Sequence, residues 1–428
     1  MPMLRLRLGK RSRTDAPAGR LCLALCLAAA SLLAGCSSAG ADGPAVVRVW
    51  HLKDSAERAL LQEHADRFNA AQDSIRLEVL YKEPEELRNH YIFGAIGRRG
   101  PDLIYGPADN AGIFGLTEVV MPLQDVLPAD FLAGFEDEGL LKWEDDVILV
   151  ADQVGNHLAF VYNKALMPEP PRTMDELVEM AQALTVDEDG DGKPERYGLT
   201  WNYTEPFFFV PFLTAEGGWV ISDDNTPTLD NAATVRAAQF VLDLRDKYKV
   251  IPRESDYNVA ETLFKEGRAA AIINGSWAWA GYGDAGVDYG IARIPYNTEA
   301  GHWAAPMKSA RGYSVNAGVK PDKLPAVLAV LQYLTGDTVQ REMAERLSTA
   351  PVRTAVLASG VVEANPILQK SLEQIEVAIP MPAAPQLRQI WDGMRGPYQL
   401  VMNGSVTAEE GARLMQRNAE KGIAETYE

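Results

Sequence analysis

The sequence predicts a mixed α/β protein built as two lobes, and three observations lead to this expectation. The chain has 428 residues, which is more than a single hydrophobic core usually supports. Short apolar strands alternate with amphipathic helices in two successive stretches, the second of which begins near Asn156. Apolar residues make up 47% of the chain and charged residues 23%, which is the composition of a folded globular protein.

The first stretch follows the order strand, helix, strand, helix, strand. Apolar and polar residues alternate over 46–50 and again over 75–79, and each pattern predicts a strand. Residues 54–72 and 87–96 carry apolar side chains at helical spacing, and 102–105 is expected to be a short buried strand. Because parallel strands need crossover connections and helices supply them, we expect a largely parallel sheet in this lobe.

The second stretch repeats the alternation and contains two marked helix starts. Thr173 and Glu176 form a capping box, in which a hydroxyl and a carboxylate accept hydrogen bonds from the free amides of a first helical turn, and Thr407 and Glu410 form another. The remaining strands are expected at 158–162, at 269–273 and after Gly312, and the remaining helices at 232–247, 326–334 and 338–346.

The amino terminus has the layout of a lipoprotein signal peptide. Basic residues up to Arg20 precede an apolar run at 21–33, which is too short for an ordinary membrane-spanning helix. The sequence LAGC then ends at Cys36, so we expect 1–35 to be removed, Cys36 to be lipidated and 36–45 to be a flexible tether. The alternative is an ordinary cysteine beside a conventional cleavage site. Either way the protein is expected to be exported, and lipidation would anchor it to the cell envelope, in the periplasm or on the outer face of the cytoplasmic membrane.

Cysteine number and charge narrow the possible partners. Of the three cysteines, Cys22 and Cys26 lie in the segment expected to be removed, so the mature chain cannot form an intramolecular disulfide. The formal net charge is −18, from 41 basic and 59 acidic residues. Such a surface repels phosphate backbones, and no nucleic-acid partner is therefore expected.

Motifs for metals and cofactors are weak or missing from the sequence. None of the five histidines forms a zinc-binding pair at helical spacing, and the sequence has no nucleophile elbow, Walker loop or dinucleotide fingerprint, so no cofactor is expected. Asp187, Asp189 and Asp191 occupy the first ligand positions of a calcium loop. The twelfth position, where a bidentate glutamate is required, is Gly198, and the alternative is an exposed turn.

Aromatic residues cluster in three places and point to a carbohydrate ligand. The run WNYTEPFFFVPF covers 201–212, INGSWAW covers 273–279, and Trp391 stands four residues before Arg395. Sugars present apolar C–H faces that aromatic rings cover, while carboxylates, amides and guanidinium groups bind the hydroxyls. Each cluster by itself is more often part of a hydrophobic core.

The order of several longer motifs resembles the family 1 extracellular solute-binding proteins of ABC importers, and in particular those that bind maltose and maltodextrins. The resemblance covers residues 46–424. It rests on the sequences at 101–105, 162–177, 205–219, 261–279 and 379–398.

This resemblance implies a type II periplasmic-binding-protein fold with a ligand cleft between its lobes. The N-terminal lobe would comprise 46–153 with 313–360, and the C-terminal lobe 157–307 with 367–428. Hinge segments are implied at 154–156, 308–312 and 361–366. The residues implied to contact the ligand are Asp54, Asp109, Asn156, Glu205, Phe207, Phe208, Tyr257, Trp277, Trp391 and Arg395.

Four positions depart from the family pattern, three of them in the N-terminal lobe and one in the first segment that crosses between the lobes. Gly106 replaces a tryptophan and Asn110 an arginine, while Asn156 replaces a carboxylate and Ser55 a lysine. Because an unpaired buried polar group is costly, a site that matches hydroxyl groups discriminates sharply. The ligand is therefore expected to be maltose, trehalose or a similar di- or oligosaccharide.

The function expected from the resemblance is a non-catalytic sugar-binding subunit. The two lobes would close around the sugar, and a membrane permease would recognise the closed form. We expect the protein to be a monomer. Two alternatives stay open at this point: a lipoprotein glycosidase that uses paired carboxylates, with Glu205 and Asp109 as the pair to test, and a sensory subunit that reports sugar to a membrane receptor.

Overall fold

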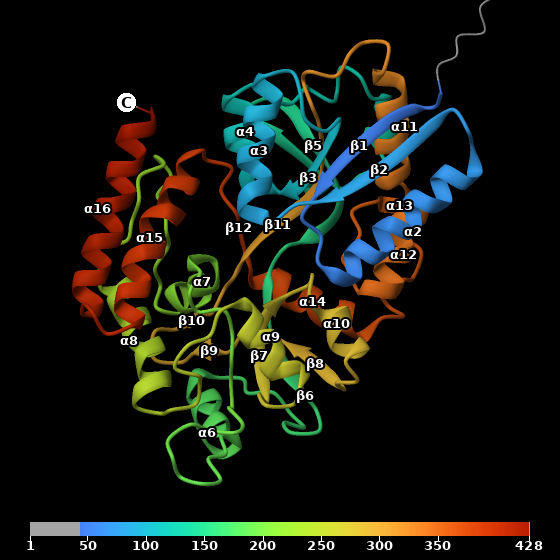
Figure 1. Ribbon diagram of the computed structural model, residues 1–428. Coiled ribbons are helices and arrows are strands. Elements are labelled where there is room, and N and C mark those ends of the chain that lie inside the picture. Colours follow the sequence, from blue (N-terminus) through green and yellow to red (C-terminus); the bar gives the residue numbers. More distant parts are fainter. Residues whose placement is uncertain (1–42, 428) are drawn as a thin grey trace, which may run out of the picture. The chain divides into compact units, whose positions relative to one another are not determined.

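A seven-stranded sheet organises the first half of the molecule (Figure 1). The structure is a computed structural model that describes residues 43–427. The strand order is β2–β1–β3–β11–β5–β4, with β12 beside β11. These strands are β1 (Ala45–His51), β2 (Ile75–Tyr81), β3 (Leu103–Pro107), β4 (Leu140–Trp143), β5 (Asp146–Gly155), β11 (Met307–Val315) and β12 (Ile379–Pro380).

The sheet is less parallel than the sequence pattern predicts. β1 pairs in parallel with β2 and β3, as expected for strands joined by helical crossovers. However, β11 pairs antiparallel with both β3 and β5, and β4 and β5 form an antiparallel hairpin. The reason is connectivity, because β4 and β5 are joined by a tight turn and β11 enters from the other half of the molecule.

Helices cover both faces of this sheet. Figure 1 shows α2 and α11 on one face and α3 and α4 on the other. Each face has its own core, the first around Val47 and Leu331 and the second around Tyr91 and Phe114. The helices of this half are α2 (Ser55–Ala71), α3 (Pro84–Ile96), η1 (Ala108–Asn110), α4 (Ala111–Leu116), α5 (Ala129–Leu132), η2 (Asp137–Gly139), α11 (Leu324–Leu334), α12 (Asp337–Leu347) and α13 (Thr354–Leu357).

A second, smaller sheet organises the other half. Its three strands are antiparallel in the order β7–β6–β8, and a separate two-stranded sheet pairs β9 with β10. The strands are β6 (Leu158–Asn163), β7 (Ala271–Gly275), β8 (Tyr289–Ala292), β9 (Tyr296–Asn297) and β10 (His302–Trp303). The helices are α6 (Met174–Leu184), α7 (Pro206–Ala215), α8 (Ala232–Asp246), α9 (Tyr257–Lys265), α10 (Trp279–Asp284), α14 (Pro366–Val377), α15 (Gln386–Met402) and α16 (Ala408–Tyr427).

The two predicted capping boxes mark real helix starts. The Thr173 hydroxyl accepts a hydrogen bond from the Glu176 amide at 3.2 Å, and the Thr407 hydroxyl accepts one from the Glu410 amide at 3.3 Å. The Glu176 carboxylate accepts from the amide of Arg172, one residue before the position that a standard capping box uses. Both helices therefore begin where side chains satisfy their free amides.

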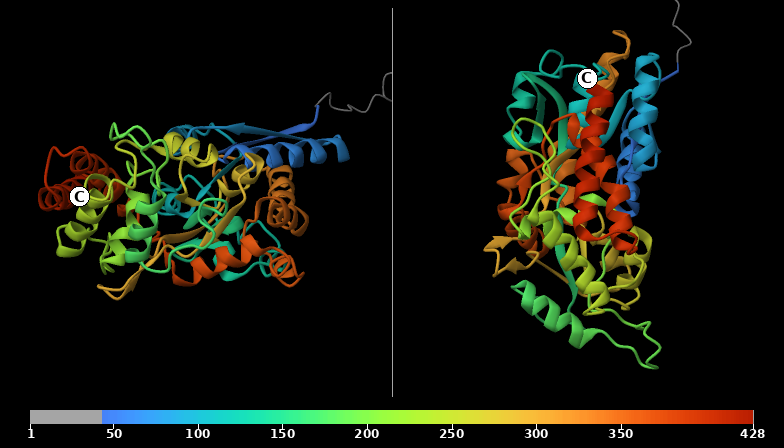
Figure 2. Two further views of the ribbon diagram at one scale, coloured as in Figure 1. Left: turned by 90° about the horizontal axis from the view of Figure 1, so that it is seen from below. Right: turned by 90° about the vertical axis from the view of Figure 1, so that its left-hand side faces the viewer.

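The helix pair α15 and α16 packs unusually closely. Figure 2 shows the two helices side by side. A Cβ atom on Gly393 of α15 would lie only 2.5 Å from the backbone nitrogen of Ala419 in α16, so glycine is required at this crossing. The pair supports α7, which is buried along most of its length and whose mean hydropathy is high, as expected for an interior helix.

The chain passes between the two sheets three times. It leaves the larger sheet at the end of β5, and Asn156 adopts a positive φ of 34° just before β6 begins at Leu158. It returns in β11, whose pairing with β5 continues to Ser309 and Gly155, and it leaves again between α13 and α14. Two of the three crossings thus run through or directly beside strands, and the third lies between two helices.

The predicted signal peptide and lipid site lie outside the described residues. Residues 1–35, Cys36 and most of the predicted tether fall before residue 43, where the description begins. Among the described helices, none combines the length and apolarity needed to cross a membrane.

Candidate ligand-binding cleft

A cavity of about 740 Å³ receives side chains from both halves of the molecule. Its volume lies in the usual range for small-molecule pockets. All ten residues that the sequence predicts as ligand contacts line it, although they come from separate segments of the chain. They are Asp54, Asp109, Asn156, Glu205, Phe207, Phe208, Tyr257, Trp277, Trp391 and Arg395.

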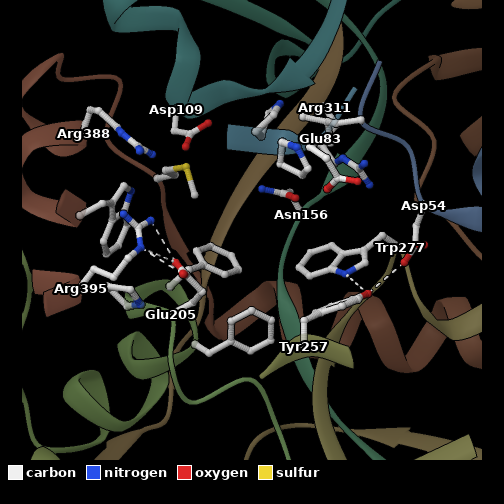
Figure 3. Close-up of a pocket in the computed structure, with 18 of the residues that line it drawn as sticks. Asp54, Glu83, Asp109, Asn156, Glu205, Tyr257, Trp277, Arg311, Arg388 and Arg395 are labelled. Atoms are coloured by element: carbon white, nitrogen blue, oxygen red, sulfur yellow. Dashed lines mark hydrogen bonds and ion pairs between the residues drawn. The ribbon is translucent and has the colours of Figure 1, made fainter. Parts of the chain in front are cut away.

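Aromatic rings form one side of the cavity, here called the floor, and they belong to the half that contains the smaller sheet (Figure 3). The floor consists of Phe207, Phe208, Trp277 and Trp391. The ring centroids of Phe207 and Trp277 lie 6.3 Å apart, and those of Phe207 and Phe208 lie 5.9 Å apart at nearly a right angle. Phe208 and Trp391 are each only 6% exposed, so they also contribute to the hydrophobic core beneath the floor.

The aromatic clusters in the sequence thus divide between core and cavity. Trp201 and Trp279 are fully buried and Tyr203 is 3% exposed, and none of these three lines the cavity. Trp277 reaches the cavity because it follows the end of β7 and folds back over Gly275. A Cβ on Gly275 would lie 2.1 Å from the indole ring, so the glycine makes room for it.

A hydrogen-bonded chain joins the floor to the opposite side of the cavity, here called the roof. The Tyr257 hydroxyl donates to Asp54 at 2.9 Å and accepts from the Trp277 indole N–H at 3.1 Å (Figure 3). Burial, together with the negative charges of Glu261 and Asp54, raises the pKa of Tyr257 well above its ordinary value, so its hydroxyl stays protonated. Asp54 also caps α2 by accepting from the Ser55 amide at 2.6 Å.

Charged side chains occupy the other end of the cavity. The Nε of Arg395 donates to both Glu205 oxygens at 3.0 and 3.1 Å, and a terminal nitrogen donates to one of them at 3.0 Å. Asp392 accepts from Arg395 at 3.0 Å and from Arg388 at 3.1 Å. Both arginine side chains are therefore oriented by carboxylates before any ligand arrives.

The roof differs from the family pattern in a way that the structure explains. Gly106 stands where the sequence resemblance implies a tryptophan, and a Cβ there would lie 2.9 Å from the side-chain amide nitrogen of Asn110. The two departures are thus coupled, because the Asn110 side chain fills the space beside the glycine. The side chain of Asn156, the third departure at the cleft, donates to the Ser309 hydroxyl at 3.2 Å.

Sequence reasoning missed several charged residues of the cavity, among them Glu83, Arg311 and Arg388. Arg388 lies three residues before Trp391 on the same helix, so helical spacing could have identified it. Arg311 is a charged residue in the middle of a strand that is buried almost throughout, and that contrast was a usable signal. Glu83 lies in the turn between β2 and α3 and carried no such signal.

The predicted calcium loop brings its acids together without completing a calcium site. The carboxylates of Asp187, Asp189 and Asp191 are exposed and lie within 4.8 Å of one another. The Asp187 oxygens accept from the amides of Gly190 and Gly192 at 2.9 and 3.0 Å, as in an ordinary turn. No glutamate stands at the twelfth position, and none of the three aspartates lines the cavity.

Two lobes that both contribute side chains to one aromatic-floored cavity define a binding protein of the periplasmic type. The chain belongs to the family of bacterial extracellular solute-binding proteins, whose characteristic sequence matches residues 63–370. A maltose/maltodextrin-binding domain from Bdellovibrio bacteriovorus, solved with maltotriose, is 40% identical with a TM-score of 0.86, and the match covers 89% of this chain and 100% of that one.

Curated relatives agree with this assignment. The maltotriose-binding protein of Pyrococcus abyssi is 25% identical over 88% of this chain and 82% of its own length. A maltooligosaccharide ABC transporter solute-binding lipoprotein of Streptococcus pneumoniae is 23% identical over 93% of this chain and 94% of its own. The predicted two-lobe fold is confirmed by the similar structures, and like these relatives the chain is a binding protein and not an enzyme.

Proposed function

We propose that this protein is the maltodextrin-binding component of an ABC importer and that it binds a short α-glucan such as maltotriose. One observation carries the proposal: ten side chains from separate segments meet in one cavity, where aromatic rings form the floor and carboxylates, an amide and a guanidinium surround them. This is the arrangement that a sugar requires, because its C–H faces are apolar and its edges carry hydroxyl groups. The relatives named above bind maltotriose or maltooligosaccharides.

The residue roles follow from their chemistry. Phe207, Phe208, Trp277 and Trp391 stack on the sugar rings, and Glu205 and Arg395 bind hydroxyl groups from the floor. Asp54, Asp109 and Asn156 bind hydroxyls from the roof side. Without a roof tryptophan, stacking comes from the floor alone, which favours a short oligosaccharide over a long dextrin.

Transport would depend on closure of the two lobes. Hinge segments at 154–156, 308–312 and 361–366 separate an N-terminal lobe (46–153 with 313–360) from a C-terminal lobe (157–307 with 367–428). A sugar that contacts both lobes stabilises the closed form by its differential affinity for the two forms. The permease then recognises the closed form.

The cellular placement follows from the amino terminus and the family. The family is extracellular, and the pneumococcal relative is a lipoprotein. We infer that 1–35 is removed, that Cys36 carries the lipid and that the protein acts as an anchored monomer. Replacing Cys36 with alanine should release the protein from the membrane fraction, which detergent phase partitioning of expressed cells would reveal.

Calorimetric titration of the purified protein with a panel of maltose, maltotriose, trehalose and a galactooligosaccharide tests the function. We expect maltotriose or maltose to bind most tightly, and a ligand at 100 times its dissociation constant to stabilise the fold by about 2.7 kcal/mol. Binding of none of these sugars, or release of glucose during incubation, would overturn the proposal.

The Trp277→Ala variant tests the stacking role directly. Removing the indole exposes sugar C–H surface to water, and we expect at least a roughly tenfold loss of maltotriose affinity. The matched control is Trp303→Ala, which removes a tryptophan that packs edge-on against Tyr296 and does not line the cavity. Equal affinities for the two variants would show that Trp277 is a core residue only.

A further inference from the structure

Four charged side chains are buried together behind the roof of the cavity. Lys53, Glu57, Asp152 and Arg311 have side-chain exposures of 3%, 2%, 1% and 3%. The Lys53 ammonium lies 2.8 Å from Asp152, and an Arg311 terminal nitrogen donates to Glu57 at 3.1 Å. Removing four charges from water costs free energy, so a contribution to the stability of the fold does not by itself explain this cluster.

Neutral side chains tie the two ion pairs into one network. The Gln153 amide donates to Glu57 and to the Tyr105 hydroxyl, both at 2.9 Å, and the Tyr105 hydroxyl donates to Asp152 at 3.1 Å. Two positive and two negative charges balance, so the network as a whole demands no counter-ion. Such a network is costly to disturb because loss of one member leaves its partner buried without compensation.

Of the four charged residues, only Arg311 lines the cavity. A guanidinium carries five N–H donors, and within residues 43–427 that of Arg311 donates one hydrogen bond to protein, to Glu57. Figure 3 places Arg311 in the roof, in the same view as Asn156 and Trp277. Its remaining donors are therefore available to whatever occupies the cavity.

The backbone is shaped to hold Arg311 in this position. β11 lies between β3 and β5, where Arg311 pairs with Pro107 and Gln153. The register between β11 and β5 shifts at Arg311 and Gly312, an irregularity that re-aims neighbouring side chains. A Cβ on Gly312 would lie 2.3 Å from the Val150 carbonyl oxygen, so glycine is required beside the arginine.

We propose that Arg311 is a ligand-contacting residue whose guanidinium donates hydrogen bonds to hydroxyl or ring oxygens of a neutral sugar, and that its ion pair with Glu57 holds it in place. This inference rests on the proposed function. The ligand class follows from charge: Glu57 compensates Arg311, and Glu205 and Asp392 pair with Arg395 and Arg388. Asp54 and Glu83 line the same cavity and repel an acidic sugar. Arg311 thus supplies polar recognition from the roof, opposite the aromatic floor.

A pair of double variants tests the proposal without leaving a buried charge unpaired. In Arg311→Met with Glu57→Gln, the ion pair that reaches the cavity is replaced; in Lys53→Met with Asp152→Asn, the ion pair behind it is replaced. Thermal unfolding reports whether each variant folds, and calorimetry with maltotriose reports affinity. We expect the first double variant to lose at least tenfold in maltotriose affinity, and the affinity of the second to stay within about threefold of the wild-type value.

The outcomes separate the two proposals. If the wild-type protein binds no sugar of the panel, the proposed function fails. If it binds but the first double variant keeps wild-type affinity, or both double variants lose affinity equally, Arg311 does not contact the ligand.

Should the first variant not fold, Arg311→Lys keeps the charge beside Glu57 but removes most donors, and we still expect at least a tenfold loss of affinity. Wild-type affinity in Arg311→Lys contradicts the inference.

A further probe is a maltotriose oxidised to its terminal uronic acid. Tighter binding of this anion than of maltotriose by the wild-type protein overturns the assignment to neutral sugars.

Discussion

Individual side chains in the cleft combine a structural role with a recognition role. Asp54 caps α2 with one oxygen and accepts from Tyr257 with the other, so a single carboxylate fixes a helix start and joins the two sides of the cavity. Tyr257 in turn orients the Trp277 indole through its N–H. Because each group is held by a second one, the floor and roof are organised before a sugar binds, which lowers the entropic cost of binding.

The Tyr257→Phe variant isolates this contact. It removes the donor to Asp54 and the acceptor for Trp277 while keeping the ring, and we expect maltotriose affinity to fall about fivefold to tenfold, as for the loss of one or two hydrogen bonds. The measurement is calorimetry beside a control, Tyr248→Phe, whose hydroxyl contacts Lys247 away from the cavity. An affinity equal to that of the control would show that this chain of hydrogen bonds plays no part in binding.

At the scale of elements, the floor depends on three helices that support one another. α7 supplies Phe207 and Phe208, α15 supplies Trp391 and Arg395, and α16 packs against α15 on the side away from the cavity. The close crossing at Gly393 sets how far α15 projects toward the cavity. A change at this crossing is therefore expected to affect both stability and the position of Trp391.

The Gly393→Ala variant should lower stability by about 1–3 kcal/mol, because its methyl group meets the backbone of Ala419 and forces the helices apart. Gly422→Ala in α16 is the matched control. Its Cβ would lie 3.4 Å from the nearest atoms of Gln389, an ordinary contact, and alanine favours the helix by up to about 1 kcal/mol. Chemical denaturation of both variants checks this, and equal stabilities would contradict the close crossing.

At the scale of the whole molecule, two halves with separate cores are joined by short crossing segments, and each half contains a buried histidine with a lowered pKa. His157 follows Asn156 in the first crossing, where it contacts the Ser371 hydroxyl at 3.3 Å and packs edge-on against Trp279. Burial lowers the pKa of His157 to about 3. Burial, with the charges of Lys53 and Arg58, lowers the pKa of His51 to about 4.

Stability should therefore decrease in mild acid. A histidine whose folded pKa is depressed binds more protons in the unfolded chain, so its contribution is complete above pH 6.5 and is lost as the pH falls toward 4. At pH 5 each of the two histidines lowers the free energy of unfolding by about 2 kcal/mol, because the loss is about 1.4 kcal/mol for each pH unit below 6.5.

Melting temperatures measured between pH 7.5 and pH 5 test this pH dependence of stability. This pH range lies above the range in which most carboxylates titrate. His157→Gln should flatten the slope, whereas the exposed His302→Gln should keep it. A His157→Gln variant with the wild-type slope would contradict the role of His157.

Local patterns predicted most elements but not every pairing. Periodicity identified the strands and helices because burial on one face imposes it on each element separately, and capping residues such as Thr173 marked helix starts. The direction of β11 could not be predicted, because it depends on where the chain re-enters the sheet, between strands β3 and β5 that lie more than 150 residues earlier in sequence. For the same reason, the largely parallel arrangement expected for the first lobe was only half correct.

The sequence by itself determined the family, the two-lobe fold and the types of residue that line the cavity, because these follow from local composition and motif order. Only the tertiary structure decided which aromatic residues are core, as Trp201 is, and which line the cavity, as Trp277 does. It also decided that Arg311 reaches the roof from a buried network and that Asn110 fills the place beside Gly106. The physical reason is that burial and charge compensation depend on neighbours brought together by folding, and residue order does not record those neighbours.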